Sequence, residues 1–172
     1  MMRIGFGYDL HKLEDGDGLM LGGIFIPSSK RAIGHSDADA LIHAIIDSLL
    51  GAAALGDIGE HFPPDNPELE NISSRILLRQ TMVLLHEKGW AVENIDSTII
   101  LQRPKLINHK AMMEECIAED LGVPAANVAV KAKTKELVDA VGEERAVEAY
   151  AVALLSGDLL SKRTPEKGSE WM

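Results

Sequence analysis

The chain has 172 residues, a formal net charge of −10, and 46% hydrophobic but only 4% aromatic residues, which fits one domain with a mainly aliphatic core. The acidic balance argues against a nucleic-acid partner, and the absence of a long apolar run or a leader-like start argues against a membrane. The single cysteine excludes an internal disulfide and a cysteine-rich zinc site, and it favours a cytoplasmic location.

Hydrophobic periodicity predicts strands over 3–10 and 19–27, followed by a helix over 36–55. Ser36 is the expected N-cap of this helix, because Asp39 three residues later completes a pattern like a capping box. The Gly, Pro, Asp and Asn content of residues 56–69 predicts a loop.

The second half continues the mixed order of elements. Helices are predicted over 73–89 and 109–122, and strands over 91–102, 127–134 and 145–155. This order indicates an α+β fold, a two-layer sandwich with three main helices on one face of a mixed β-sheet. A single domain is expected to span 1–157, with a frayed tail over 158–172. The other sheet face then needs a cover, and a partner subunit is the economical one.

Asp9 and His11 are the first candidates for chemistry. They lie two residues apart on a predicted strand, so their side chains share one side. On the predicted helix, Asp39, His43 and Asp47 form a polar stripe at i, i+4 and i+8, and the helix contains no lysine or arginine. A His₂Asp set from Asp9, His11 and His43, with a carboxylate orienting His43, would suit a catalytic zinc with an open fourth position. The alternative is a solvated strand end and helix face.

Two further places suit phosphate or a second ion. His35 and Ser36 precede the helix, where free N–H groups and the dipole favour an anion, although a plain N-cap is the alternative. Thr134 and Glu136 would share one side of a strand, a hydroxyl for phosphate and a carboxylate for Mg²⁺. An ordinary edge strand would also explain the lysines that alternate with them, Lys131, Lys133 and Lys135.

The chain lacks a Gly-rich phosphate loop, a Gly-x-Ser-x-Gly motif and a convincing nucleophile–base pair. A metal site without a protein nucleophile indicates attack by water or by another part of the substrate.

Four stretches together resemble one family: "RIGFGYDLHKL", "GHSDADALIHAIIDSLLGAAALGDIGEHFP", "DSTIILQRPKL" and "VKAKTKE". The chain resembles the 2-C-methyl-D-erythritol 2,4-cyclodiphosphate synthase family of the non-mevalonate isoprenoid pathway over about residues 2–156. The resemblance implies a lyase that converts 4-diphosphocytidyl-2-C-methyl-D-erythritol 2-phosphate to the cyclic diphosphate and CMP. The 2-phosphate would attack the β-phosphorus of the same molecule.

The resemblance also implies roles for individual residues. Asp9, His11 and His43 would hold Zn²⁺, and Glu136 would hold Mg²⁺ or Mn²⁺ as a second ion. His35 and Thr134 would stabilise the transition state. The expected substrate contacts are Ser36, Asp57, Ile58, Gly59, Phe62, Pro63, Pro64, Asp65, Asn66, Leu101, Gln102, Arg103, Pro104, Lys105, Leu106, Ile107, Lys133 and Lys135. Family members are homotrimers with an active site at each subunit interface.

The sequence departs from the commoner bacterial pattern at three positions. Ala140 and Glu143 stand where that pattern has phenylalanine and arginine, so the arginine's phosphate-binding role is not carried over. Ala38 replaces a glycine, which we expect to be a mild change on a helix. "LQRPK" and "KAKTKE" resemble the plant-type branch.

Two rival functions fit the same residues. A zinc-dependent phosphoesterase would use water at the His₂Asp site. A trimeric nucleotide-binding module without catalysis would leave the polar stripe and Glu136 unexplained.

Overall fold

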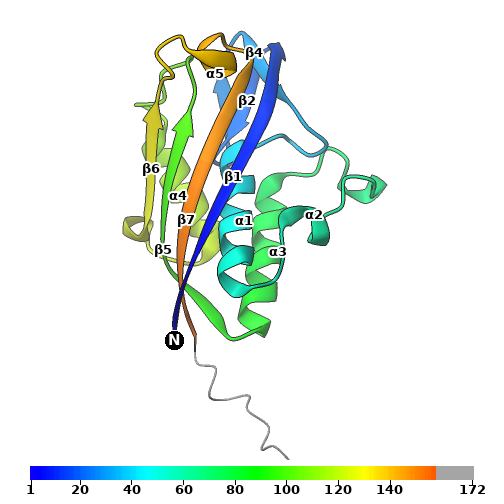
Figure 1. Cartoon of the computed structure of the whole chain (residues 1–172), viewed down its shortest axis with the longest axis vertical. Coiled ribbons are helices and arrows are strands. Elements are labelled where there is room, and N and C mark those ends of the chain that lie inside the picture. Colours follow the sequence, from blue (N-terminus) through cyan, green and yellow to red (C-terminus); the bar gives the residue numbers. More distant parts are fainter. Residues whose placement is uncertain (158–172) are drawn as a thin grey trace, which may run out of the picture.

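The computed structural model describes residues 1–157, which form a sheet layer and a helix layer (Figure 1). The predicted tail over 158–172 lies outside the described residues. The strands are β1 (Met2–Asp15), β2 (Gly18–Leu21), β3 (Ile24–Pro27), β4 (Lys30–Ile33), β5 (Trp90–Ile100), β6 (Val128–Lys133) and β7 (Ala146–Gly157). The α-helices are α1 (Ala40–Ala53), α2 (Ile58–His61), α3 (Ser74–Glu87), α4 (Lys110–Leu121) and α5 (Asp139–Gly142), and 3₁₀ turns η1 and η2 cover Pro67–Leu69 and Ala125–Asn127.

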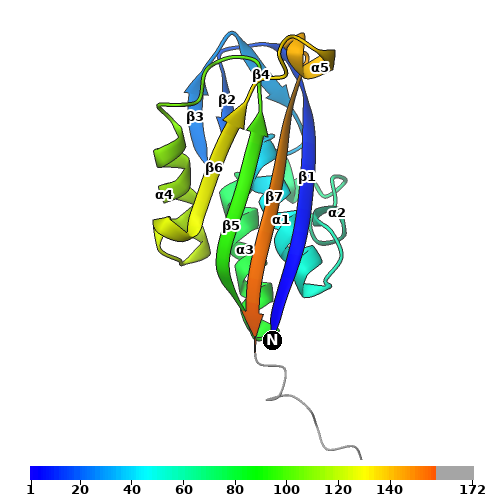
Figure 2. The ribbon, with the colours of Figure 1, turned by 60° about the vertical axis from the view of Figure 1, so that its left-hand side comes forward.

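The main sheet is mixed, as predicted. Its strand order is β4-β1-β7-β5-β6, with β5 and β6 parallel and the other neighbours antiparallel. Figure 2 shows α1 and α3 behind this sheet, and Figure 1 shows α4 behind β5 and β6, which confirms the α+β arrangement of three main helices on one face. None of the helices within residues 1–157 is long and apolar enough to cross a membrane.

Two glycines of β1 allow α1 to lie directly on the sheet. A Cβ built at Gly7 would come within 1.9 Å of the Ala44 carbonyl oxygen, and one at Gly5 within 2.0 Å of the Ser48 oxygen. Because alternate residues of a strand face the same side, Asp9 and His11 continue the row begun by the glycines. The close approach therefore sets the distance between these two side chains and α1.

The start of α1 differs from the prediction. The helix begins at Ala40, and its N-cap is the fully buried Asp39, not Ser36. The Asp39 carboxylate accepts hydrogen bonds from the N–H groups of Ile42 at 3.1 Å, Gly22 at 2.9 Å and Gly23 at 2.6 Å. Asp39 prevails because a carboxylate has enough lone pairs to satisfy both the helix end and the β2–β3 turn.

Ala38 is therefore not a helical residue, and the expectation of a mild change on a helix is wrong. Its φ is 58°, a left-handed conformation that favours glycine. Its side chain is nevertheless buried at the start of α1.

Other differences arise at turns. Residues 19–27 form the hairpin β2–β3 because Gly22 and Gly23 adopt positive φ angles of 62° and 78°. The strand β6 ends at Lys133, and Glu136 has a φ of 52°. The predicted strand alternation therefore stops before Thr134 and Glu136.

We predict that Gly7→Ala lowers the free energy of unfolding by about 1–3 kcal/mol or more, because the added methyl must push α1 away from β1. Gly51→Ala is the matched control: this glycine is exposed on α1, and its added Cβ would meet nothing closer than 4.0 Å. The free energy of unfolding of this control should rise by about 0.5–1 kcal/mol, because alanine favours a helix interior over glycine. Denaturant unfolding at matched protein concentration measures both variants, and equal stability of the two would contradict the close-approach argument.

Candidate metal and substrate site

Asp9 and His11 on β1 and His43 on α1 bring three candidate ligand atoms together. Asp9 Oδ2 lies 2.9 Å from His11 Nε2 and 3.0 Å from His43 Nδ1, and the two nitrogens are 3.1 Å apart. All three residues are half-buried. Within residues 1–157, this is the one group of three or more His, Cys, Asp or Glu side chains arranged so that it could hold a metal ion.

The hydrogen bond of the other His11 nitrogen defines what the ring offers to the group. His11 Nδ1 lies 2.9 Å from the Ile33 carbonyl oxygen, which can only accept, so Nδ1 carries a hydrogen. In the neutral ring, the form that binds a metal, Nε2 then presents its lone pair. Two imidazole nitrogens and a carboxylate oxygen form a donor set that fits a divalent cation such as Zn²⁺.

The same contacts set the charge of the group. Burial raises the pKa of Asp9, but the close contacts with the His11 and His43 rings outweigh this effect and hold the pKa of Asp9 well below its usual range. Burial lowers the pKa of His11, but the contact with Asp9 outweighs it and leaves the pKa of His11 raised. Asp9 is therefore ionised at neutral pH and offers a negative charge to a cation.

A cavity of about 250 Å³ opens beside the three residues. Its polar lining comes from His11, His35, Ser36 and His43. The remaining lining is mainly apolar and consists of Ile58, Gly59, Phe62, Pro64, Leu69, Ile72 and Leu77.

The other residues predicted for this region do not line the cavity. Asp57 and Asn66 cap short helical turns, accepting from the backbone N–H groups of Glu60 and Glu68. Pro63 and Asp65 belong to the same loop. Asp47, the last residue of the predicted polar stripe, accepts from the Ile58 N–H at 2.8 Å and so holds this loop to α1.

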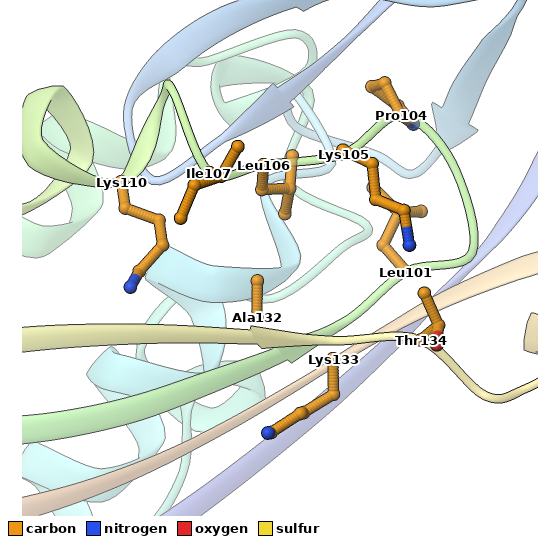
Figure 3. Close-up of a pocket in the computed structure, with 9 residues that line it drawn as sticks. All are labelled: Leu101, Pro104, Lys105, Leu106, Ile107, Lys110, Ala132, Lys133 and Thr134. Carbon is orange, nitrogen blue, oxygen red and sulfur yellow. The ribbon is translucent and has the colours of Figure 1, made fainter.

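A second cavity, of about 370 Å³, lies between the segment after β5 and the end of β6 (Figure 3). Its lining residues are Leu101, Pro104, Lys105, Leu106, Ile107, Lys110, Ala132, Lys133 and Thr134. Three lysines beside apolar side chains suit an anionic ligand with a flat apolar part. Gln102 and Arg103 instead line an adjoining hollow with Ser28 and Ser29.

Thr134 and Glu136 come together through a turn, not through strand alternation. The Thr134 hydroxyl donates a hydrogen bond to the Glu136 carboxylate. Lys135 points to other acids, with its Nζ 3.1 Å from Glu148 Oε2 and 3.5 Å from Asp139 Oδ2. The positive charge of Lys135 is therefore paired with these two carboxylates of its own chain.

Within one chain, the predicted site residues fall into two separate sets. His35 lines the cavity beside Asp9, His11 and His43, whereas Thr134 lines the lysine-containing cavity. The two cavities share no lining residue. A single chain therefore does not assemble His35 and Thr134 around one cavity.

Sequence reasoning missed Ser74, which lies 2.8 Å from His43 Nε2, and Lys110 in the lysine-containing cavity. The pair Ser73-Ser74 before an apolar helix pattern indicates a helix start. Nothing in the sequence indicates that Ser74 meets a histidine on another helix.

Comparisons with known proteins agree with this geometry. The YgbB family profile matches residues 2–156. A 2-C-methyl-D-erythritol 2,4-cyclodiphosphate synthase of Dechloromonas aromatica is 52% identical over 153 residues, 89% of this chain and 96% of the relative. The structure of the Plasmodium falciparum IspF–CDP complex superposes with a TM-score of 0.80 at 36% identity, covering 91% of this chain and 97% of that one. The bifunctional IspDF of Campylobacter jejuni gives a TM-score of 0.88 at 33% identity, covering 92% of this chain and 43% of that longer one.

Proposed function

The chain belongs to the YgbB family, and on that premise we propose how its own residues carry out the family's reaction. It is an enzyme that forms 2-C-methyl-D-erythritol 2,4-cyclodiphosphate in non-mevalonate isoprenoid biosynthesis. The observation that carries the proposal is the convergence of Asp9, His11 and His43 beside a cavity, in a chain that matches the family over nearly its full length.

Asp9, His11 and His43 hold one Zn²⁺ in this proposal. Two imidazoles and a carboxylate would suit a catalytic zinc, because structural zinc sites usually take four protein ligands. The bound ion supplies a Lewis acid for a phosphate oxygen of the substrate. Glu136 holds a second ion, Mg²⁺ or Mn²⁺, because a carboxylate together with substrate phosphates is a usual ligand set for such ions.

The reaction itself needs no protein nucleophile. An oxygen of the substrate's 2-phosphate, already an anion, bonds to the β-phosphorus, while the bond from that phosphorus to the α-phosphate oxygen breaks. The electron pair of that bond leaves with CMP. His35 donates a hydrogen bond to the charge that develops on the phosphoryl oxygens, and Thr134 does the same once its hydroxyl turns from Glu136 to the substrate.

The two cavities take different parts of the substrate. The cavity of His35 and Ser36 takes the methylerythritol part, with Ile58, Gly59 and Phe62 against its carbon skeleton. The cavity lined by Lys105, Lys110, Lys133 and Thr134 takes the cytidine phosphates. The CDP in the related Plasmodium structure supports a cytidine nucleotide as ligand.

A homotrimer with active sites between subunits would unite these two cavities. The sheet face opposite the helices carries an exposed apolar stripe of β1, in which Ile4 is 71% and Phe6 64% exposed. Tyr8 and Leu10 continue the stripe, and Tyr150 of β7 contacts the Tyr8 ring at a centroid distance of 5.0 Å. A contiguous apolar patch of this kind is typical of a subunit interface. A cytoplasmic location, which suits the one free cysteine, completes the proposal.

For the metal, we predict that His43→Ala binds less than one Zn²⁺ per chain. Its Zn²⁺ affinity should fall by more than roughly 10- to 100-fold, the usual cost of changing a residue that only contacts a metal ligand. His86→Ala is the control, since this histidine is exposed near the end of α3. Equilibrium dialysis with metal analysis measures both variants, and circular dichroism checks the fold. Full zinc stoichiometry in His43→Ala would disprove the ligand assignment.

For the reaction, we expect ³¹P NMR of the diphosphocytidyl substrate incubated with the protein, Zn²⁺ and Mg²⁺ to show cyclic diphosphate and CMP. Linear phosphates instead would indicate a phosphoesterase that uses water, and unchanged substrate would indicate a binding module. Glu136→Gln should slow the reaction and raise the Mg²⁺ concentration required, because it removes the anionic ligand.

For the assembly, we predict that Phe6→Glu converts a trimer to a monomer and abolishes turnover, because a charge would be buried in the interface. Val83→Glu is matched in chemistry and exposure, since Val83 is 57% exposed on α3. Sedimentation velocity should find the control trimeric. A wild-type monomer with full activity would refute the interfacial site.

A further inference from the structure

Resting on the proposed metal site, we propose that Ser74 and Asp37 are positioning residues that hold His43 with Nε2 protonated and Nδ1 turned to the metal. Neither residue touches the three ligand atoms or lines a cavity of the site. Both act through one ring nitrogen of His43.

The contacts form a chain from a carboxylate to the ligand. Ser74 is fully buried, and its Oγ lies 2.8 Å from His43 Nε2. The same hydroxyl donates to Oδ1 of Asp37. The second oxygen of Asp37 accepts from the Ser74 backbone N–H at 3.0 Å, so the carboxylate holds Ser74 at two points.

Hydrogen counting gives this chain a direction. A carboxylate can only accept, so the one hydrogen of the Ser74 hydroxyl is committed to Asp37. The hydroxyl can then meet His43 only as an acceptor, which requires a hydrogen on Nε2. In a neutral imidazole the lone pair is then on Nδ1, the atom 3.0 Å from Asp9 Oδ2. The ring is thus prepared for a cation before one binds.

Ser36 does not replace Ser74 in this role. Its Oγ lies 3.1 Å from His43 Nε2, farther than that of Ser74, and it also lines the cavity. Its Oγ is 3.4 Å from the Ala38 N–H and 3.5 Å from Ser74 Oγ, and no carboxylate among residues 1–157 fixes its hydrogen. The direction of the hydrogen bond to His43 is therefore set by Ser74 and Asp37.

The same carboxylate ties α3 to the metal site. Ser73, the N-cap position of α3, makes no side-chain capping bond, and the Ser74 N–H is satisfied by Asp37 from another segment. The Asp37 N–H in turn donates to the Ile72 oxygen at 3.1 Å. The start of α3 is thereby fixed against the loop that precedes α1.

The test measures Zn²⁺ affinity of the full chain by competition with a chromophoric chelator. Ser74→Ala should weaken Zn²⁺ binding by about 10- to 100-fold, the usual cost of losing an outer-shell partner. Ser48→Ala is the matched control, because it removes an equally buried hydroxyl whose one hydrogen bond within residues 1–157 is to Ile45 O of its own helix. The control should stay within about 2-fold of the wild type.

A double-mutant cycle distinguishes this chain of contacts from general destabilisation. Asp37→Asn leaves Ser74 without one of its two acceptors and should also weaken Zn²⁺ binding. Combined with Ser74→Ala it should add almost nothing, because Asp37 acts through the hydroxyl that is already absent. If the double variant lost Zn²⁺ affinity by the product of the two single losses, the proposal would be overturned. It would also be overturned if Ser74→Ala bound Zn²⁺ as tightly as Ser48→Ala does.

Long-range ¹H–¹⁵N NMR of the zinc-loaded wild type provides a direct readout of the ring. We expect His43 to carry its hydrogen on Nε2 and its metal shift on Nδ1, and the reverse assignment would overturn the proposal. If His43→Ala loses zinc and Ser74→Ala keeps wild-type affinity for it, the positioning role is refuted and the metal site stands. A wild type that binds no zinc refutes the metal site and the positioning role together.

Discussion

The structure depends on one constraint: a carboxylate oxygen and two imidazole nitrogens must meet within about 3 Å of one another, although they come from a strand and a helix. Like lone pairs repel unless a cation lies among them, so every backbone element near the group must be held firmly. Asp9 and His11 are fixed by the pleat of β1, and His43 is fixed by the position of α1. The rest of the fold can be understood as the means of keeping that strand and that helix in contact.

Three features keep them there. The glycines of β1 remove the side chains that would separate α1 from the sheet. Asp39, buried under the start of α1, joins the helix to the β2–β3 turn through three backbone N–H groups. Asp37, two residues earlier, accepts a hydrogen bond from the Ser74 N–H and so joins the start of α3 to the same segment. The short segment before α1 thus places both helices, which explains why two acids are buried or half-buried beside a site that already carries the charge of Asp9.

The sequence predicted those parts of the site that depend on local periodicity. Strand alternation placed Asp9 and His11 on one side, and hydrophobic periodicity predicted the helix that carries His43. Prediction failed where one group had two partners remote in sequence, as when Asp39 displaced Ser36 as the N-cap. It failed again beyond Lys133, where the strand ends and a turn with left-handed Glu136 and Leu137 follows, although Thr134 and Glu136 still meet. The contact of Ser74 with His43 is set by helix packing, for which a single sequence carries no signal.

The chain has a formal net charge of −10, which would repel the anionic substrate that we propose. Lysines collect around one cavity, and the candidate cation site lies beside the other. The most direct test of the central claim is X-ray absorption spectroscopy of the zinc-loaded protein. We expect nitrogen and oxygen ligands at about 2.0–2.1 Å with the scattering pattern of two imidazoles. A sulfur ligand at about 2.3 Å, or a shell without two imidazoles, would contradict it.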